Sequence, residues 1–202
     1  TRFDVLRSAT EETFEQFGVS DPDPDHIEDM TIGATPRSVA NVCEAYDLQP
    51  ETFWRVRDKT MSGAQQAEAR AGRKTPYGDL GVLNDLNASC GIVSSNQQET
   101  VDFLLDHFDI GGLFETAYGR EATVESLDLR KPNPHYLERA LADLDADSAL
   151  FVGDNESDIK AAENAGIDSA FIRRPHRTDW ELNVWPTWDI DSLEDLHRVC
   201  SS

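Results

Sequence analysis

The sequence predicts an α/β protein in which a helical first half precedes a doubly wound parallel sheet. Two observations carry this prediction. From residue 75 onward, short apolar runs alternate with segments of helical periodicity, which is typical of parallel strands covered by helices on both faces. Before residue 75, only helical periodicity is found. With 202 residues, of which 39% are hydrophobic, the chain can bury one core domain and a smaller attachment.

The first half is expected to contain three helices. The first begins near Phe3, which lies on its apolar face, and ends at Gly18. Two more are predicted over residues 36–46 and 50–70. Between them and the first helix, residues 21–25 (DPDPD) indicate a turn with helix-capping acids, although these three carboxylates could also hold a cation.

Strands and helices are expected to alternate in the second half. The clearest unit is an apolar run at 149–152, followed by Gly153, Asp154 and a helix that ends at Gly166. Ligands of such sheets bind at the carboxyl ends of the strands, so polar residues placed there are candidates for a site. The predicted order is helix 79–86, strand 90–93, helix 98–107, strand 114–118, helix 134–144, strand 149–152, a helix that begins after a turn at 155–157, strand 169–172 and a strand near 188–190.

The formal net charge is −21, and only four of the 18 basic residues are Lys. Acids dispersed along the chain with little Lys resemble proteins of salt-loving organisms, in which high salt screens self-repulsion; an ordinary acidic protein is the alternative. Nucleic acid is an unexpected partner, because phosphate backbones bind to basic stripes. The one basic cluster, residues 173–177, is interpreted as a solvated loop.

The cysteines and the hydropathy predict a cytoplasmic protein without a membrane partner. Cys43, Cys90 and Cys200 show neither disulfide nor zinc spacing, so a reducing cytoplasm is expected. No apolar run reaches the length of a membrane span, and we expect no membrane partner. No signal peptide is visible, but the sequence begins at a Thr, so a targeting segment upstream would be unseen. A monomer or a homodimer is expected.

Four polar side chains fall at strand ends or helix starts of the second half. Ser94 is predicted to end one strand, Lys131 precedes a helix, and Asp154 and Asp158 flank the turn after another strand. A hydroxyl, a cation and a carboxylate pair suit the binding of a phosphoryl group with Mg²⁺, which prefers a few carboxylates plus phosphate oxygens. Three of the four have a simpler reading: Ser94 as a helix cap, Lys131 as a solvated side chain, and Asp158 as a partner of the helix dipole.

The order of these residues resembles the haloacid dehalogenase (HAD) superfamily. GIVSSNQ is similar to its second motif, RKPNPHYLERAL to its third, and FVGDNESDIKAAENAG to its acidic fourth. The resemblance implies a Rossmann-like core over residues 75–202 and a small helical cap over residues 1–74. It further implies that Ser94 binds phosphoryl oxygens and Lys131 stabilises nucleophile and phosphate.

The resemblance assigns the remaining site residues as well. Asp154 is expected to bind Mg²⁺. Asp158 is expected either to be a further ligand or to support the ligands without touching the metal. Asn96 and Asn155 are plausible supporting polar groups, with Asn96 able to reach the substrate. Arg37 opens a helix of the cap and is the candidate for gripping a second anionic group, although a surface Arg is the simpler reading.

The family's first motif, a strand ending in DxD that supplies the nucleophile, is not found in this sequence. We expect that the sequence begins downstream of that motif, with roughly 10–20 residues of strand and turn missing. The sheet should then show a gap between the strands of Val93 and Val152, or an unexpected element that fills it. Without the attacking carboxylate, the 202 residues by themselves are expected to lack phosphatase activity.

The predicted function is that of a Mg²⁺-dependent phosphatase, similar to phosphoglycolate phosphatases, which acts on a small phosphorylated metabolite through an aspartyl-phosphate. Two alternatives stay open. A 2-haloacid dehalogenase of the same family attacks carbon and needs no metal, but family dehalogenases lack the acids of the fourth motif. A non-catalytic HAD-fold binding protein has no need to keep Ser94, Lys131 and the aspartate pair together.

Overall fold

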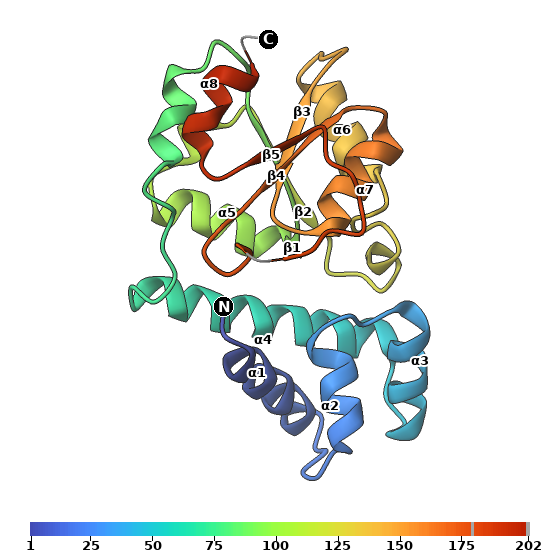
Figure 1. Cartoon of the computed structure of the whole chain (residues 1–202). Helices are drawn as coiled ribbons and strands as arrows, with labels where there is room; N and C mark the ends of the chain where they lie inside the picture. Colours follow the sequence, from blue (N-terminus) through green and yellow to red (C-terminus); the bar gives the residue numbers. More distant parts are fainter. Residues whose placement is uncertain (179, 201–202) are drawn as a thin grey trace. The chain divides into compact units, whose positions relative to one another are not determined.

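The computed structural model describes residues 1–178 and 180–200, which form two compact units (Figure 1). The first unit contains Thr1–Thr75, Ser94–Asp109 and Gly119–Asp128, and the second contains Pro76–Val93, Ile110–Tyr118 and the described part of Leu129–Ser202. The domain boundary predicted between residues 74 and 75 stays a prediction.

The first unit is mainly helical. Its aromatic core forms where α1 and α4 pack together, with Phe14, Phe53 and Trp54 almost fully buried. Proline occupies the first position of α3 and of α4, where its fixed φ suits a helix and its missing N–H costs no hydrogen bond. The elements are α1 (Phe3–Gln16), α2 (Pro24–Thr31), α3 (Pro36–Ala45), α4 (Pro50–Arg70), α5 (Gln98–His107) and η3 (Glu125–Leu127).

Most helices predicted for this part are confirmed, with two differences. Asp23 accepts a hydrogen bond from the backbone N–H of Asp25 at 2.9 Å, so the DPDPD stretch does cap a helix; that helix, α2, was not predicted. Phe3 begins α1, on the helix face that the sequence marks, but its side chain is 46% exposed. It lies in the first turn, and the buried face begins only at Ala9.

The second unit combines parallel strands with helices. Strands β3, β4 and β5 form one parallel sheet, in which Gly153 pairs with Phe171 and Phe171 with Asp189. Strands β1 and β2 form a separate sheet, and both continue into residues of the first unit. The elements are η1 (Leu80–Asp85), β1 (Gly91–Gln97), η2 (Gly111–Leu113), β2 (Thr116–Arg120), α6 (His135–Asp143), β3 (Leu150–Gly153), α7 (Glu156–Ala165), β4 (Asp168–Ile172), β5 (Trp188–Ile190), η4 (Leu193–Asp195) and α8 (Leu196–Val199).

Both faces of the β3–β4–β5 sheet are covered, as the apolar β4 sequence requires. Because side chains alternate along a strand, Ala170 and Ile172 point to one face and Phe171 to the other. The first pair packs with residues of η1, η4 and α8, whereas Phe171 packs with Ile159 of α7. This is the α/β architecture that the sequence predicts: a Rossmann-like parallel-sheet core with a helical cap.

Strand β1 differs from its prediction. It was expected to stop at Val93, so that Ser94 would lie at its end, but it extends to Gln97 and Ser94 lies inside it. Pairing with β2 extends the strand into a polar stretch that shows no apolar alternation. The predicted gap between β1 and β3 is confirmed for the described residues, since β1 has only β2 and β3 only β4 as a paired neighbour.

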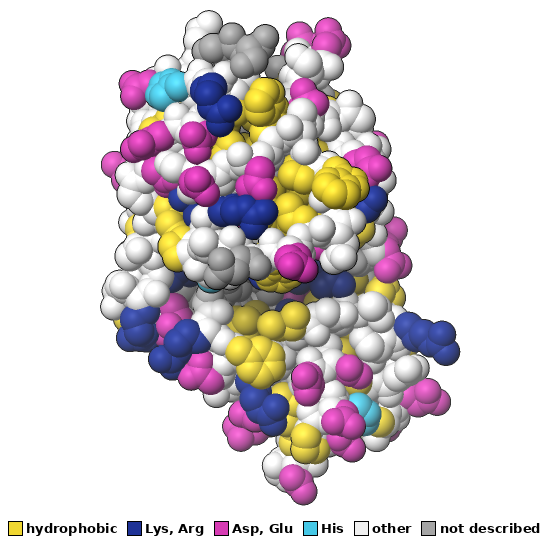
Figure 2. All heavy atoms as spheres, viewed as in Figure 1, with side chains coloured by type: hydrophobic (Ala, Val, Ile, Leu, Met, Phe, Trp, Pro, Cys, Tyr) yellow, Lys and Arg dark blue, Asp and Glu magenta, His cyan; other side chains and the backbone are white. Residues whose placement is uncertain are grey.

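The surface is strongly acidic, as the charge predicts. Asp and Glu side chains spread over the face drawn in Figure 2 and are not confined to one patch. Within the described residues, no helix combines the length and the apolar character that crossing a membrane requires.

Candidate active site

The turn between β3 and α7 holds the two aspartates predicted to bind metal. Asn155 caps α7, because its side-chain oxygen accepts a hydrogen bond from the backbone N–H of Ser157 at 3.2 Å. In return, Oδ2 of Asp158 accepts a hydrogen bond from the backbone N–H of Asn155 at 3.1 Å. Gly153 permits this tight turn, since a Cβ at that position would overlap the Asp158 side chain. The supporting polar group Asn155 therefore acts on the backbone of the turn.

Lys131 reaches this turn from the segment before α6. Its Nζ lies 2.7 Å from Oδ1 of Asp158 and donates a hydrogen bond to the backbone carbonyl of Val93 at 3.1 Å. The ammonium also lies 5.1 Å from the centroid of the Phe151 ring, within the range of a cation–π interaction. Lys131 thus links β1 with the turn that follows β3.

The Asp158 carboxylate is fully engaged by the protein. One oxygen pairs with Lys131 and the other accepts from the backbone N–H of Asn155, while the Asp158 side chain is only 8% exposed. A carboxylate in this position is well suited to orient Lys131. The resemblance left two roles open for Asp158, and these contacts favour a residue that supports the metal site without touching the metal.

Asp154 is the accessible acid of the turn. It follows Gly153 directly, and its side chain is 39% exposed. Its Oδ2 lies 2.9 Å from Nε2 of His176. Asp154 therefore has the exposure that a ligand to a cation with its own water molecules requires.

His176 contacts the acidic turn, which the sequence did not predict. It belongs to the basic cluster, residues 173–177, which was interpreted as a solvated loop. Because β3 and β4 are parallel neighbours, the segments that follow them leave the same edge of the sheet, and this brings His176 to Asp154. The signal in the sequence was a basic segment directly after a predicted parallel strand.

Ser94, Asn96 and Arg37 belong to the first unit. Oγ of Ser94 accepts a hydrogen bond from the backbone N–H of Asn96 at 3.1 Å, and Oδ1 of Asn96 accepts one from Gln65 of α4 at 3.4 Å. Arg37 is exposed in the first turn of α3. Their predicted contacts with substrate stay predictions. Ser94 directly follows Val93 in β1, and the Val93 carbonyl accepts a hydrogen bond from Lys131 within the second unit.

A buried ion cluster anchors the ends of β1 and β2 in the first unit. Oδ1 of Asp58 accepts hydrogen bonds from Gln97 at 3.1 Å and from Arg120 at 2.7 Å. The side chains of Asp58 and Arg120 are 1% and 3% exposed. Since an unpaired charge at this depth would be costly, this cluster holds the Ser94–Gln97 segment in place.

An apolar cavity of about 730 Å³ lies inside the second unit, between β1 and β3. Gly91 and Val93 of β1 line it, as do Leu150 and Val152 of β3. Among the described residues, β1 and β3 each have a paired strand on one side only, and such an edge offers unpaired backbone groups. The cavity therefore lies at the gap predicted from the sequence.

The parallel sheet, with its acidic turn and the paired lysine, defines a Rossmann-like protein, a class in which ligands commonly bind at the carboxyl ends of the strands. The chain belongs to the haloacid dehalogenase-like hydrolase family, whose model matches residues 2–172. This confirms the resemblance found in the sequence.

Known proteins similar to this chain carry phosphatase names. The pyrophosphatase PpaX of Bacillus cereus (strain G9842) is 29% identical over 132 residues, which cover 64% of this chain and 59% of PpaX. The match thus spans about three-fifths of that relative.

Two solved structures share the fold. The crystal structure of a predicted phosphoglycolate phosphatase from Haemophilus somnus 129pt has a TM-score of 0.61 at 18% identity, and covers 98% of this chain and 91% of that one. CbbY from Rhodobacter sphaeroides in complex with phosphate has a TM-score of 0.59 at 16% identity, with 96% and 89% covered. At these identities the likeness concerns the fold alone.

Proposed function

We propose that this protein is a Mg²⁺-dependent phosphatase that hydrolyses a small phosphorylated metabolite through an aspartyl-phosphate. The observation that carries the proposal is the position of Lys131, whose ammonium joins the Val93 carbonyl to the Asp158 carboxylate. A cation held at the carboxyl ends of parallel strands is suited to neutralise phosphoryl oxygens. The names of the relatives, PpaX among them, support phosphoryl chemistry.

The donor set fits Mg²⁺. No group of three or more His, Cys, Asp or Glu side chains that could hold a metal is found among the described residues. Mg²⁺ needs no such group, because it commonly binds one or two carboxylates and completes its shell with waters and substrate phosphate. Asp154 would hold it, and the ion would supply charge stabilisation to the phosphoryl group.

The attacking group is proposed to be an aspartate carboxylate outside residues 1–202, on a strand that lies between β1 and β3. The apolar cavity and the two unpaired strand edges support that place. The carboxylate attacks phosphorus, the bond to the substrate oxygen breaks, and that oxygen takes a proton as it leaves. Water then cleaves the acyl phosphate, releasing inorganic phosphate and restoring the carboxylate.

In this scheme Lys131 and Ser94 hold the phosphoryl oxygens. Asp158 keeps Lys131 oriented. Asn155 caps the first turn of α7 and so holds the turn that carries Asp154. Asn96 and Arg37 are proposed as substrate contacts. A chain limited to residues 1–202 is expected to bind Mg²⁺ weakly and to lack turnover.

The experiment uses the full-length gene product with p-nitrophenyl phosphate in molar KCl. Hydrolysis that requires Mg²⁺ and stops in a chelator supports the phosphatase. Equal hydrolysis in chelator would contradict the Mg²⁺ dependence, and release of chloride from 2-chloropropionate would favour the dehalogenase. Absence of both activities favours the non-catalytic binding protein.

The working environment is part of the proposal. The net charge of −21 and the acidic surface favour a high-salt cytoplasm, where screening shortens the range of self-repulsion. We expect the midpoint of thermal unfolding to rise between 0.2 and 2 M KCl. A midpoint independent of salt would contradict this adaptation.

A further inference from the structure

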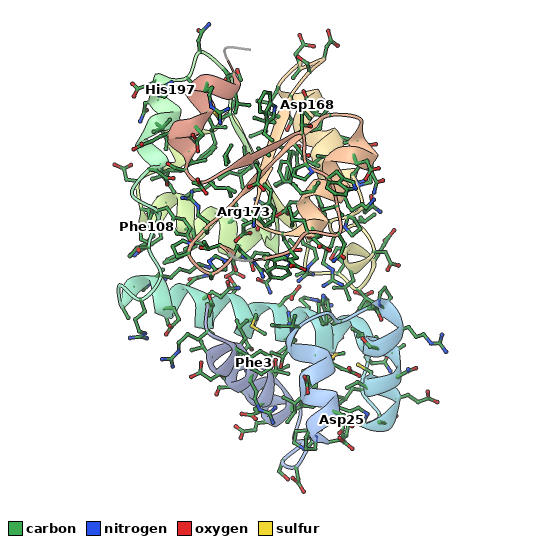
Figure 3. The ribbon with its side chains drawn as sticks, viewed as in Figure 1. Phe3, Asp25, Phe108, Asp168, Arg173 and His197 are labelled. Atoms are coloured by element: carbon green, nitrogen blue, oxygen red, sulfur yellow. The ribbon has the colours of Figure 1, made fainter. Side chains whose placement is uncertain are left out.

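A chain of hydrogen-bonded side chains connects α4 with the end of β1 inside the first unit. Asp58 and Gln65 lie seven positions apart on α4, which places them on one face of the helix. Figure 3 draws the side chains of α4 above the labelled Phe3 of α1. Gln65 is 4% exposed, and its amide contacts Lys74 through one atom and Asn96 through the other.

Lys74 fixes the orientation of the Gln65 amide. An ammonium group only donates hydrogen bonds, so the Gln65 atom that lies 3.1 Å from Nζ of Lys74 must be the oxygen Oε1. The hydroxyl of Thr1 donates to the same oxygen at 3.4 Å. The NH₂ group of Gln65 therefore points away from Lys74, toward the residues of β1.

Asp58 fixes the opposite end of the chain of hydrogen bonds. Its carboxylate is ion-paired with Arg57 and Arg120 and only accepts, so the NH₂ group of Gln97 faces it at 3.1 Å. The Gln97 oxygen is then turned toward Gln65, whose Nε2 donates to it at 3.4 Å. A cation that only donates and an anion that only accepts thus set the direction of the hydrogen bonds between them.

The same NH₂ group of Gln65 orients Asn96. It carries two hydrogens, and it donates to Oδ1 of Asn96 at 3.4 Å. Asn96 is left with its own NH₂ group, which has no hydrogen-bond partner in the part of the chain that the structure describes. The backbone N–H of Asn96 donates to Oγ of Ser94 at 3.1 Å, which leaves the Ser94 hydroxyl hydrogen free to donate as well.

We propose that Lys74 and Gln65 are positioning residues that hold Asn96 as a hydrogen-bond donor to a phosphoryl oxygen of the substrate. Phosphoryl oxygens accept hydrogen bonds, and an Asn96 turned the other way would present an oxygen that repels them. This inference rests on the proposed function, because it requires Asn96 and Ser94 as substrate contacts. Lys74 and Gln65 act through Asn96 and touch no reacting atom.

The test measures kcat/KM of the full-length protein for p-nitrophenyl phosphate with Mg²⁺, and the inhibition constant of inorganic phosphate. Gln65→Glu is nearly isosteric, and its carboxylate still accepts from Lys74. It has no hydrogen to donate to Asn96, so the Asn96 amide turns and donates to Glu instead. The oxygen of Asn96 would then face the phosphoryl group.

The matched control is Gln66→Glu, the same change at the next residue of α4. Oε1 of Gln66 also accepts from a cation, since Arg70 donates to it at 3.1 Å. Its NH₂ group donates to Ser62 at 3.2 Å and has no contact with β1 among the described residues. Both variants therefore place a new carboxylate beside a cation, and only one of them reverses the Asn96 amide.

We expect Gln65→Glu to lower kcat/KM and to raise the inhibition constant of phosphate, each about 10- to 100-fold, as loss of a hydrogen bond to a charged group does. Gln66→Glu should change both less than about twofold. Lys74→Arg should retain most of the activity, because a guanidinium also only donates, whereas Lys74→Met should lose about 10-fold. This second pair of variants decides the matter if Gln65→Glu fails to fold.

A double-mutant cycle shows whether Gln65 acts through Asn96. In an Asn96→Ala protein, Gln65→Glu should lower kcat/KM by less than about twofold further, because the amide that it reverses is gone. A merely structural role of Gln65 would add its full loss in that background. A thermal midpoint of Gln65→Glu close to that of the wild type would separate the loss from unfolding.

Two results overturn the inference in distinguishable ways. If Gln65→Glu behaves as Gln66→Glu does, or loses as much activity in the Asn96→Ala protein as in the wild type, Gln65 does not position Asn96 and the proposed function still stands. Equal activities of Lys74→Arg and Lys74→Met would likewise exclude Lys74. If the wild type hydrolyses no p-nitrophenyl phosphate with Mg²⁺, the proposed function itself is refuted, and the inference falls with it.

Discussion

Lys131 and Asp158 form an ion pair of 2.7 Å in which both side chains are nearly buried, at 12% and 8% exposure. They come from segments 27 positions apart in the sequence and meet where the turn after β3 enters α7. The pair has two consequences. It keeps an ammonium at the carboxyl ends of the strands, and it makes each charge depend on the other.

Replacing Lys131 by Met should therefore destabilise the protein. The substitution leaves the Asp158 carboxylate without its cation, and we expect a loss of about 3 kcal/mol in the free energy of unfolding. Urea denaturation measures it. Lys160→Met is the matched control, because the exposed pair of Lys160 with Glu163 should contribute about 0.5 kcal/mol or less. Equal losses of unfolding free energy in the two variants would show that the buried pair contributes no more to stability than the exposed pair.

Replacing Asp154 by Ala should remove Mg²⁺ dependence with little effect on the fold, since Asp154 is 39% exposed. We expect turnover of the full-length protein to fall about 100-fold or more, as loss of one electrostatic stabiliser commonly does. Asp168→Ala is the control, because Asp168 begins β4 and pairs with Leu150 at the opposite end of the sheet. Retention of metal-dependent turnover in Asp154→Ala would exclude Asp154 as the ligand.

Gly153→Ala should damage the turn. A Cβ at residue 153 would overlap Asp158, so the turn must open or Asp158 must leave Lys131. We expect a loss of about 2 kcal/mol, within the range for overpacked positions, and weaker phosphate binding. Gly63→Ala is the control: no atom lies within 4 Å of its new Cβ, and a mid-helix Gly→Ala change should stabilise by about 0.5–1 kcal/mol. Similar stability for both variants would contradict the close packing of Asp158 on Gly153.

Asp79 should contribute to acid sensitivity. Burial by itself would raise the pKa of the Asp79 carboxyl, but Arg174 and the backbone N–H of Leu193 hold this pKa below its ordinary value of 3.8. Because the pKa of Asp79 is lower in the folded state than in the unfolded state, its ionised carboxylate stabilises the folded protein at pH values above 3.8. This stabilisation is lost as the pH falls from 3.8 through the lower pKa of the folded state.

The measurement compares urea unfolding of the wild type and Asp79→Asn from pH 3 to pH 6. The difference in unfolding free energy should be constant near pH 6 and shrink at the acid end. A difference that grows on acidification would have the wrong sign for a depressed carboxyl pKa.

The sequence predicted the local structure of the turn between β3 and α7 correctly, because neighbouring residues determine it. Asp154, Asn155 and Asp158 lie within five residues, so a strand, a glycine and a capped helix place them without help from distant segments. The starts of α3 and α4 were also predicted correctly, because a proline at the first position of a helix is a local signal. The motifs also sufficed to recognise the family.

Errors arose where hydrogen bonding between distant segments decides the structure. Ser94 looked like the end of a strand because polar residues follow it, yet pairing with β2 continues β1 to Gln97. Residues 79–86 were predicted as a helix and form the 3₁₀ segment Leu80–Asp85. Neighbouring segments, not local periodicity, set these limits.

By itself, the sequence determined the α/β class, the family, the acidic turn and the charge, because these depend on composition and on spacing within one segment. Only the tertiary structure decided that Lys131 pairs with Asp158 and that His176 lies against Asp154. Both contacts depend on which strands and loops become neighbours, and a parallel sheet makes neighbours of segments that are separated along the chain by a helix. The physical reason is that spacing along a chain determines a helix or a turn, whereas strand pairing is chosen by the energy of the whole fold.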